Sequence, residues 1–267
     1  MSLHIAIDGI DGTGKTTMTE KLADFLKHKN YRVRTAVQPV CPEIITILQN
    51  YNLTNHEQAL LFAFDRSLTY YGENWDEYDL VIWDRSILSS IAYNTDNNTP
   101  LKYIKQINKY FPEMDLYLVI QPTPEDITET PDYNDTPVDL ILEKYDYIIS
   151  NHKNTVKVPY QPDEPEAMFQ DIVEILFEEL PRCNWCGRFF TPTKHYKKYC
   201  KDECRKYGLQ EQRRVNNSNY YYRYRDVMTE KQKGGLGSKN ANLHGKADPN
   251  PLKELQKIRN AKRALGI

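Results

Sequence analysis

A glycine-rich segment near the N-terminus has the residue types and spacing of a loop that binds phosphate groups. Residues 9–16 read GIDGTGKT and match the pattern G-x-x-x-x-G-K-[ST] completely. Glycines let backbone N–H groups turn toward an anion, Lys15 supplies a charge for the outer phosphates, and Thr16 offers a hydroxyl to Mg²⁺. The pattern predicts binding of a nucleotide such as ATP. The predicted phosphate-binding residues are Gly9, Asp11, Gly12, Thr13, Gly14, Lys15, Thr16 and Thr17.

The residues on either side of this loop predict the local structure that phosphate binding needs. An apolar run, residues 3–7, precedes the loop and has the character of a buried strand. After the loop, Met18, Leu22 and Leu26 recur on one face of a predicted helix. The positive end of that helix dipole would face the phosphates. The alternative is a glycine-rich turn that matches the pattern by coincidence.

A second apolar run ends in charged residues that could act in phosphoryl transfer. Residues 80–86 read LVIWDRS, so Asp84 stands where a strand ends and could hold Mg²⁺ directly or through water. The next residue, Arg85, could clamp the phosphate of an acceptor with two hydrogen bonds. Asp84 alone would be a weak signal, and Arg85 could instead form a surface ion pair.

Two further segments carry residues that could bind an acceptor. In LLFAFDRS, residues 60–67, Phe62 and Arg66 are four apart on a predicted helix, so one could stack on a base while the other reaches a phosphate. SSIAYN, residues 89–94, follows Asp84 closely enough to line the same site. The alternatives are that Phe62 belongs to the core and that Arg66 forms a surface ion pair.

Four of the five cysteines gather in one short segment with metal-ligand spacing. Two lie in a C-x₂-C pair and, thirteen residues later, two in a C-x₃-C pair. Four thiolates in two close pairs suit tetrahedral Zn²⁺, whereas redox-active thiols are the alternative. A module this small has too little apolar area to fold alone, so the metal should supply much of its stability. The predicted zinc ligands are Cys183, Cys186, Cys200 and Cys204.

The net charge of the chain changes sign just before the cysteine segment. Residues 1–181 contain 14 Lys and Arg against 30 Asp and Glu, a net of −16, while residues 182–267 contain 21 against 7, a net of +14. The basic part suggests an anionic partner, a nucleic acid or a protein, and in residues 211–226 arginines alternate with tyrosines that could stack on bases. The alternatives are a solvated tail and a tail that docks on its own acidic domain.

Strand-like runs alternate with helical patterns through the acidic part of the chain. This rhythm predicts an α/β fold of the P-loop type, a doubly wound parallel sheet of five strands, followed by a small zinc-binding module and a helical tail. We expect three domains, at residues 1–180, 181–210 and 211–267, the last with a glycine-rich linker and a final helix. The predicted strands are residues 3–8, 32–38, 80–84, 116–121 and 155–160, and the predicted helices are residues 15–29, 55–71, 87–93, 101–110, 137–150 and 165–179.

No run approaches the ~20 apolar residues that span a bilayer, so we expect a cytoplasmic protein without a membrane partner. The clustering of the cysteines fits a reducing compartment.

The three charged motifs together resemble the thymidylate kinase family. DGIDGTGKTT corresponds to the family's E-G-x-D-G-x-G-K-[ST]-T, LFAFDR to its L-F-x-x-[DN]-R, and DRSILSSIAYN to its D-R-Y-x-x-S-x-x-A-Y-[QN]. The resemblance covers about residues 1–180. It implies transfer of a phosphoryl group from ATP, with Mg²⁺, to dTMP, giving dTDP, and it is compatible with a homodimer. The cysteine segment resembles small treble-clef-like zinc fingers, in which its phenylalanines and Tyr199 would form the core.

The resemblance also assigns roles to residues. Lys15 and Thr16 would bind the donor phosphates and Mg²⁺, and Asp11 would face the acceptor. Phe62 would stack on thymine, and Arg66 and Arg85 would bind the acceptor phosphate. Tyr93 would lie against the deoxyribose, and Asp84 would act near Mg²⁺ or orient the acceptor. The expected catalytic residues are Lys15, Asp84, Arg85 and Arg66.

Two departures from the family pattern leave the acceptor open. Residues 37–40 read VQPV where the family has R-E-P-G, and residues 122–145 contain no arginine and only Lys144 as a cation. Lys102, Lys105 or a group from the basic C-terminal part could substitute for the missing arginine. The alternatives are a kinase for another nucleoside or nucleotide and, in a different class, a nucleotide-dependent nucleic-acid-binding protein with little kinase activity.

Overall fold

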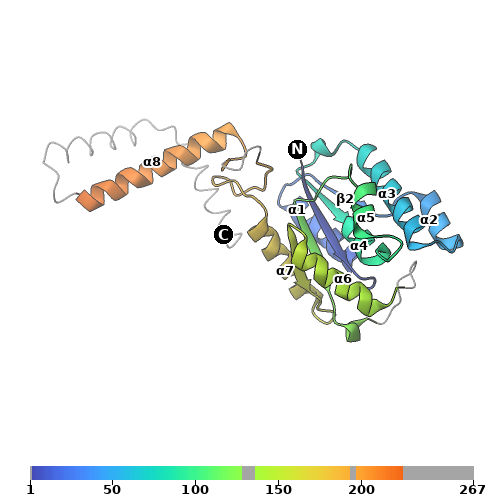
Figure 1. Ribbon diagram of the computed structural model, residues 1–267. Helices are drawn as coiled ribbons and strands as arrows, with labels where there is room; N and C mark the ends of the chain where they lie inside the picture. The colour runs from blue at the N-terminus through green and yellow to red at the C-terminus, as the bar shows by residue number, and fades with distance from the viewer. Residues whose placement is uncertain (1, 128–135, 193–196, 225–267) are drawn as a thin grey trace. The chain divides into compact units, whose positions relative to one another are not determined.

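The computed structural model describes residues 2–127, 136–192 and 197–224, and it divides into two compact units (Figure 1). The first unit contains Met1–Pro181 and Phe189–Thr193, and the second contains Arg182–Arg188 and Lys194–Ile267. The predicted glycine-rich linker and final helix of the tail lie outside the described residues. Each unit is considered by itself below.

The first unit is built on a parallel sheet of five strands in the order β2-β3-β1-β4-β5, which confirms the predicted fold class. In the central pairing Ile7 lies opposite Asp84 of β3 on one side and opposite Leu118 of β4 on the other. Parallel strands end at a common edge, so the loops after β1 and β3 are neighbours there. The strands are β1 (Leu3–Gly9), β2 (Val33–Val37), β3 (Leu80–Asp84), β4 (Leu116–Gln121) and β5 (Thr155–Pro159).

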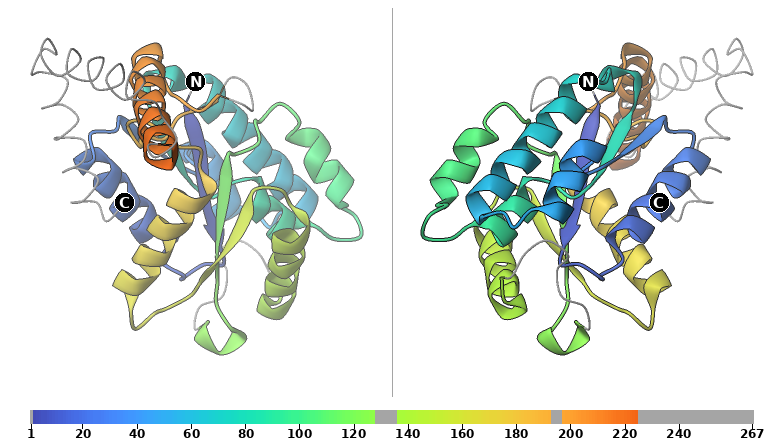
Figure 2. Two further views of the ribbon diagram at one scale, coloured as in Figure 1. Left: turned by 90° about the vertical axis from the view of Figure 1, so that its left-hand side faces the viewer. Right: turned by 90° about the vertical axis from the view of Figure 1, so that its right-hand side faces the viewer.

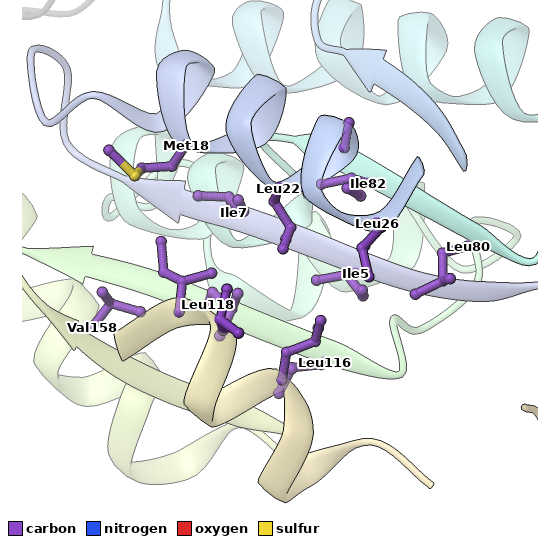
Figure 3. Packing of buried hydrophobic residues seen from close by; sticks show 14 of the residues in the cluster. Ile5, Ile7, Met18, Leu22, Leu26, Leu80, Ile82, Leu116, Leu118 and Val158 are labelled. Carbon is purple, nitrogen blue, oxygen red and sulfur yellow. The ribbon is translucent and has the colours of Figure 1, made fainter. Parts of the chain in front are cut away.

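Helices cover both faces of this sheet (Figure 2). On one face, α1 (Lys15–His28) and α7 (Pro165–Glu179) pack against the apolar side chains of the central strands. Figure 3 shows Met18, Leu22 and Leu26 of α1 directed at the strands. On the other face lie α3 (Asn55–Tyr71), α4 (Ile87–Asn94), α5 (Leu101–Ile107) and α6 (Val138–Asn151), around a second buried cluster that includes Trp83, Tyr117 and Tyr145.

One helix, α2 (Pro42–Asn50), was not predicted from the sequence. Its interior reads EIITILQ, a β-branched run that weakens the helical signal. The structure forms the helix because Pro42 fits the first turn and because Ile44 and Leu48, four residues apart, are both buried. Two short 3₁₀ turns, η1 (Trp75–Glu77) and η2 (Pro124–Asp126), complete the elements described in this unit.

Phe189 belongs to the first unit, although it lies among the cysteines in the sequence. It is buried in the cluster beneath α1 and α7, its ring lies near those of Tyr31 and Phe177, and its backbone N–H donates to the Tyr31 hydroxyl over 3.0 Å. The expectation that the phenylalanines form the core of the zinc module is therefore wrong for Phe189. Its neighbours in the sequence suggested the zinc module. The apolar side chains of the first unit bury it instead.

The second unit contains one long helix, α8 (Asp202–Tyr224), which starts between the last two cysteines. Trp185 and Tyr207 stack with ring centroids 5.9 Å apart, and Tyr199 lies against Gly208 so closely that a Cβ there would meet its ring. In the part of the chain that the structure describes, no helix has the length and apolar character needed to cross a membrane.

Candidate functional site

The loop between β1 and α1 has a backbone that only glycine adopts easily. Gly9, Gly12 and Gly14 have φ values of 142°, 80° and 76°. A Cβ on Gly9 would lie 2.5 Å from the carbonyl oxygen of Ile120, so the first glycine is also required by the close approach of β4. The loop ends at Gly14, and α1 begins at Lys15 with unpaired N–H groups in its first turn. This is the cradle that the sequence pattern predicts for phosphate groups.

Lys15 is folded back against the loop. Its Nζ donates to the carbonyl oxygen of Ile10 over 2.6 Å and lies 3.6 Å from an oxygen of Asp11. Burial lowers the pKa of Lys15 to about 8, although Asp84 and Asp8 oppose this shift. A phosphate would therefore meet an ammonium group that is already desolvated and held beside the loop.

Thr16 and Asp84 are brought together by the register of β1 and β3. The Thr16 hydroxyl donates to Oδ2 of Asp84 over 2.5 Å. Asp84 is buried, and that burial raises the pKa of its carboxyl group. A hydroxyl and a carboxylate are the hard oxygen ligands that Mg²⁺ prefers, so these two residues fit the ion. Thr17 follows, exposed, in the first turn of α1.

Asp11, Arg85 and Tyr93 form a charged cluster next to the loop. Arg85 donates to one oxygen of Asp11, and the Tyr93 hydroxyl donates to the other over 3.2 Å. The Asp11 backbone N–H donates to the Tyr93 hydroxyl over 3.1 Å, and the Arg85 guanidinium lies 5.8 Å from the centre of the Tyr93 ring. Arg85 and Asp11 remain about one quarter exposed. The structure thus joins three predicted acceptor residues into one partly open site.

Arg66 is buried on α3, and its side chain contacts Ser86 and Ser90, which follow β3. Its side chain donates to Asn108 over 2.8 Å, to Ser90 over 2.6 Å and to the backbone oxygen of Ser86 over 3.4 Å. Burial lowers the pKa of Arg66 to about 10. The alternative of a surface ion pair is therefore wrong for this residue. Its role toward an acceptor phosphate stays a prediction.

Phe62, one turn before Arg66, is half-buried and, within the described residues, lies outside both buried core clusters. The alternative that Phe62 is a core residue is therefore unsupported. Its partly exposed ring is available to contact a ligand, although stacking on a base stays a prediction.

Several residues that were not predicted from the sequence hold this site in shape. Asp8, fully buried, accepts hydrogen bonds from the hydroxyls of Ser86 over 2.5 Å and Ser89 over 2.6 Å. The Tyr145 hydroxyl donates to the carbonyl oxygen of Gly9 over 3.3 Å. Asp8 lies near the end of a buried strand, as Asp84 does, and this position in the sequence could have identified it as a candidate. Tyr145 comes from α6, and no local pattern connects it to the loop.

The segment that departs from the family pattern is fixed by backbone contacts. The Gln38 N–H donates to the carbonyl oxygen of Asp84 over 3.1 Å, and the Gln38–Pro39 peptide bond is cis. The carboxylate of Asp65, which is fully buried, accepts from the N–H groups of Val40 and Cys41 over 2.8–3.1 Å. Asp65 is therefore the residue that anchors this segment, and it does not form a surface ion pair.

Among the described residues, neither Lys102 nor Lys105, which could replace the missing arginine, nor Lys144, the cation of the arginine-free segment, forms a hydrogen bond or ion pair with the cluster of Asp11, Arg85 and Tyr93. Lys144 donates to the carbonyl oxygen of Thr95 over 2.7 Å, and Lys102 and Lys105 are exposed on α5. Residues 128–135, the centre of the arginine-free segment, lie outside the described residues. Substitution by a lysine stays a prediction.

The four predicted zinc ligands converge in the second unit. Their Sγ atoms all lie within 4.8 Å of one another, and Cys200 is 3.6 Å from both Cys186 and Cys204. Tetrahedral zinc with bonds of ~2.3 Å requires sulfur atoms about 3.8 Å apart, so the donor set fits the ion. A tight turn with Gly187 at φ 73° brings the Cys183 N–H to the Arg188 carbonyl oxygen at 2.9 Å.

A P-loop beside the cluster of Asp11, Arg85 and Tyr93, on a five-stranded parallel sheet, is typical of P-loop kinases that act on small phosphorylated acceptors. Comparisons with known proteins identify the family. The thymidylate kinase family model matches residues 7–150. A probable thymidylate kinase of Methanosphaera stadtmanae is 33% identical over 179 residues, which cover 61% of this chain and 91% of that protein. The chain belongs to the thymidylate kinase family, as predicted.

Other relatives and solved structures agree. A probable thymidylate kinase of Methanobrevibacter smithii is 38% identical over 126 residues, or 44% of this chain and 63% of that protein. The crystal structure of thymidylate kinase from Ehrlichia chaffeensis has a TM-score of 0.53 at 21% identity and covers 66% of this chain and 98% of that one, so it supports the fold. ATP and Mg²⁺ are the general requirements of this family of kinases.

Proposed function

We propose that this protein transfers the γ-phosphoryl group of ATP to dTMP, giving dTDP and ADP. The observation that carries the proposal is the cluster of Asp11, Arg85 and Tyr93 beside the phosphate loop. A cation and two oxygen groups lie together there, which supports binding of a second, smaller phosphorylated molecule next to the donor. Family membership supports the choice of dTMP as that molecule.

Donor binding is assigned to the loop and the first turn of α1. The residues Gly9 to Thr17 would receive the phosphates through backbone N–H groups, and the Lys15 ammonium would neutralise charge that develops on the transferred group. The Thr16 hydroxyl and the Asp84 carboxylate would hold Mg²⁺, which when bound neutralises the phosphate oxygens. Removal of this charge compensation should stop the reaction, because phosphoryl transfer depends on positioning and electrostatics.

Acceptor binding is assigned to the residues around Arg85. Its guanidinium would hold the dTMP phosphate, and Asp11, now paired with Arg85, would receive a hydroxyl of the sugar. The phosphate oxygen then attacks the γ-phosphorus of ATP as the bond to the bridging oxygen of ADP breaks. Tyr93 would contact the deoxyribose, and Phe62 would contact the base. Arg66 would help Arg85 to bind the acceptor phosphate.

A panel of acceptors tests this function. Zinc-loaded protein is assayed with ATP and Mg²⁺ against dTMP, dUMP, dCMP, dAMP, dGMP, thymidine and uridine monophosphate, with kcat/KM measured for each. We expect dTMP to exceed the others by at least tenfold. A larger kcat/KM for a different acceptor would replace dTMP by that nucleotide or nucleoside. No turnover on any acceptor would favour a nucleotide-dependent binding protein instead.

The proposal includes a structural Zn²⁺ bound by the four cysteines and three domains at residues 1–180, 181–210 and 211–267. Support for the metal comes from the convergence of the four Sγ atoms. Because Phe189 belongs to the first unit, we infer that segments of the kinase and zinc domains alternate along the sequence near their boundary. A cytoplasmic location is part of the same proposal and is consistent with free rather than bridged cysteines.

The surface of α3 supports a homodimer. Leu60, Phe64 and Leu68 follow one another at intervals of four residues, and Tyr71 continues the stripe. All four are exposed, Phe64 by 57% and Tyr71 by 63%. An apolar stripe of this length is costly in water, and a second copy of the chain could cover it. The Phe64→Asp variant should change the molar mass measured by light scattering from dimer to monomer, whereas Tyr147→Asp, at an equally exposed position on α6, should not.

A further inference from the structure

The second unit carries a concentration of positive charge that phosphoryl transfer to a mononucleotide does not use. Residues 182–224 contain eleven Lys and Arg against three Asp and Glu, a net of +8. The exposed cations of the described part of this unit, apart from Arg214, which pairs with Glu211, form what we call the basic surface. It consists of Lys197, Lys198, Lys201, Arg205, Lys206 and Arg213.

The backbone holds these cations in fixed positions. The carbonyl oxygen of Lys198 accepts from the N–H of Asn184, which ties this segment to the cysteine turn. Lys206 and Arg213 are seven residues apart on α8, and at 100° per residue they lie within about 20° of each other around the helix. Arg205 lies within about 80° of Arg213 on the same side. Cys204 and Gly208 are buried on another side of the helix, so the cations face outward.

Acidic residues do not cancel this charge. Asp202 and Glu203 lie in the first turn of α8, where their carboxylates interact favourably with the positive end of the helix dipole. Glu211 forms an ion pair with Arg214 at 2.9 Å and so neutralises a different arginine. Within the described part of the second unit, no recorded ion pair engages Arg205, Lys206 or Arg213. The three cations are therefore available to an external anion.

The length of α8 suits a chain of phosphates better than a single anion. Its 23 residues extend over about 34 Å, and most of the side chains described on it, at residues 202–218, are polar or charged. Aromatic side chains are also present in this unit: Tyr207 is 39% exposed and stacks on Trp185, which is half-buried. Cations for phosphates, together with a flat exposed ring for an unpaired base, are the combination that binds single strands.

We propose that the basic surface of the second unit binds single-stranded nucleic acid, mainly through its phosphates. An acidic protein could pair with the cations, but its carboxylates would not stack on the exposed Tyr207 ring. A duplex would offer no unpaired base to that ring. This binding function is separate from that of the kinase site, so it can be tested without measuring nucleotide turnover.

The test is fluorescence anisotropy with a labelled 20-nucleotide oligo(dT), using the full-length, zinc-loaded protein from about 50 to 200 mM salt. The variant Arg205→Ala, Lys206→Ala, Arg213→Ala should bind about 10- to 100-fold more weakly at low salt. Its plot of log affinity against log salt should be less steep by about 2, since each single-strand phosphate contact contributes ~0.7. A 20-base-pair duplex should bind more weakly than the single strand.

The matched control removes three exposed lysines of the first unit, Lys109→Ala, Lys153→Ala, Lys157→Ala, and should bind as the unsubstituted protein does. Zinc content and far-ultraviolet circular dichroism establish that both variants are folded. A second variant, Arg205→Lys, Arg213→Lys, keeps the charge and should retain most of the affinity. Absence of binding at 50 mM salt, an equal loss in the control, or tighter binding of the duplex would overturn the proposal.

Discussion

The two units of this protein are stabilised in different ways. The first buries two layers of apolar side chains against a five-stranded sheet and carries an excess of acidic residues. The second gathers four cysteines and carries an excess of basic residues. A sheet with a large core can hold a strained phosphate loop in place, whereas a unit with little core needs a metal to fold. The difference predicts that each unit can be disrupted by a change that leaves the other intact.

Zinc removal should have the largest effect, and it should be confined to the second unit. Structural zinc contributes apparent free energies of about 10–16 kcal/mol in small zinc-dependent peptides, so its loss should unfold the cysteine module. Treatment with a strong chelator should make residues after Pro192 sensitive to protease. Turnover of dTMP should stay within about twofold of the untreated protein. Loss of turnover in parallel with zinc release would show that the two units depend on each other.

The variant Lys15→Ala should have the next largest effect, on the first unit alone. Loss of a preorganised charge at the transferred phosphate should lower kcat by about 10³-fold, equivalent to about 4 kcal/mol. The zinc content should remain one ion per chain. Lys21 lies on α1 like Lys15, is half-exposed and pairs with Glu166 of α7, so Lys21→Ala is the matched control and should change kcat by less than about twofold. Equal effects of the two substitutions would contradict the assigned role of Lys15.

Phe189 tests where the boundary between the units lies. Because Phe189 is buried in the core of the first unit, Phe189→Ala should lower that unit's free energy of unfolding by about 3–4 kcal/mol. Thermal unfolding followed at the tryptophans measures the change, and zinc retention should be unaffected. Phe190→Ala, a half-buried neighbour, should cost less. Loss of zinc without a change in unfolding temperature would instead place Phe189 in the cysteine module.

His4 should make the stability of the first unit depend on pH. Its ring stacks on Trp83 and accepts from the indole N–H over 3.1 Å, and burial lowers the pKa of His4 from 6.5 to about 4. The unfolded chain therefore binds the proton more tightly, so the stabilisation is present above pH 6.5 and is lost as the pH falls toward 4. The full loss is about 3 kcal/mol.

Urea unfolding between pH 4 and 7 measures this dependence, with His4→Gln as the variant that cannot titrate. The difference in unfolding free energy between the two proteins should shrink or reverse as the pH falls. A constant difference across the range would show that His4 is not the responsible group.

The main elements of the first unit could be predicted because their signals are local. The alternating pattern of strands and helices predicted the sheet, and the glycine spacing predicted the loop from Gly9 to Thr16. Asp84 and Arg85 were predicted as site residues from their place at the end of a strand, and Tyr93 from the family resemblance. The structure brings Arg85 and Tyr93 onto Asp11.

What could not be predicted depends on which distant segments meet. Tyr145 of α6 reaches the carbonyl oxygen of Gly9, and Asp65 of α3 anchors the segment before α2, although each pair is far apart or unrelated by pattern in the sequence. Phe189 was assigned to the cysteine module by its sequence neighbours, but it is buried with Tyr31 and Phe177 instead. The sequence shows which residues are apolar enough to be buried. The whole fold determines which other residues they pack against.

The most direct test of the account is product analysis of a single reaction. Purified full-length protein is incubated with ATP, Mg²⁺ and dTMP, and ³¹P nuclear magnetic resonance follows every phosphorus signal. The account predicts that dTDP and ADP appear in equal amounts, and that the Lys15→Ala variant produces neither at a comparable rate. Formation of ADP and inorganic phosphate without dTDP, or no consumption of ATP, would contradict it.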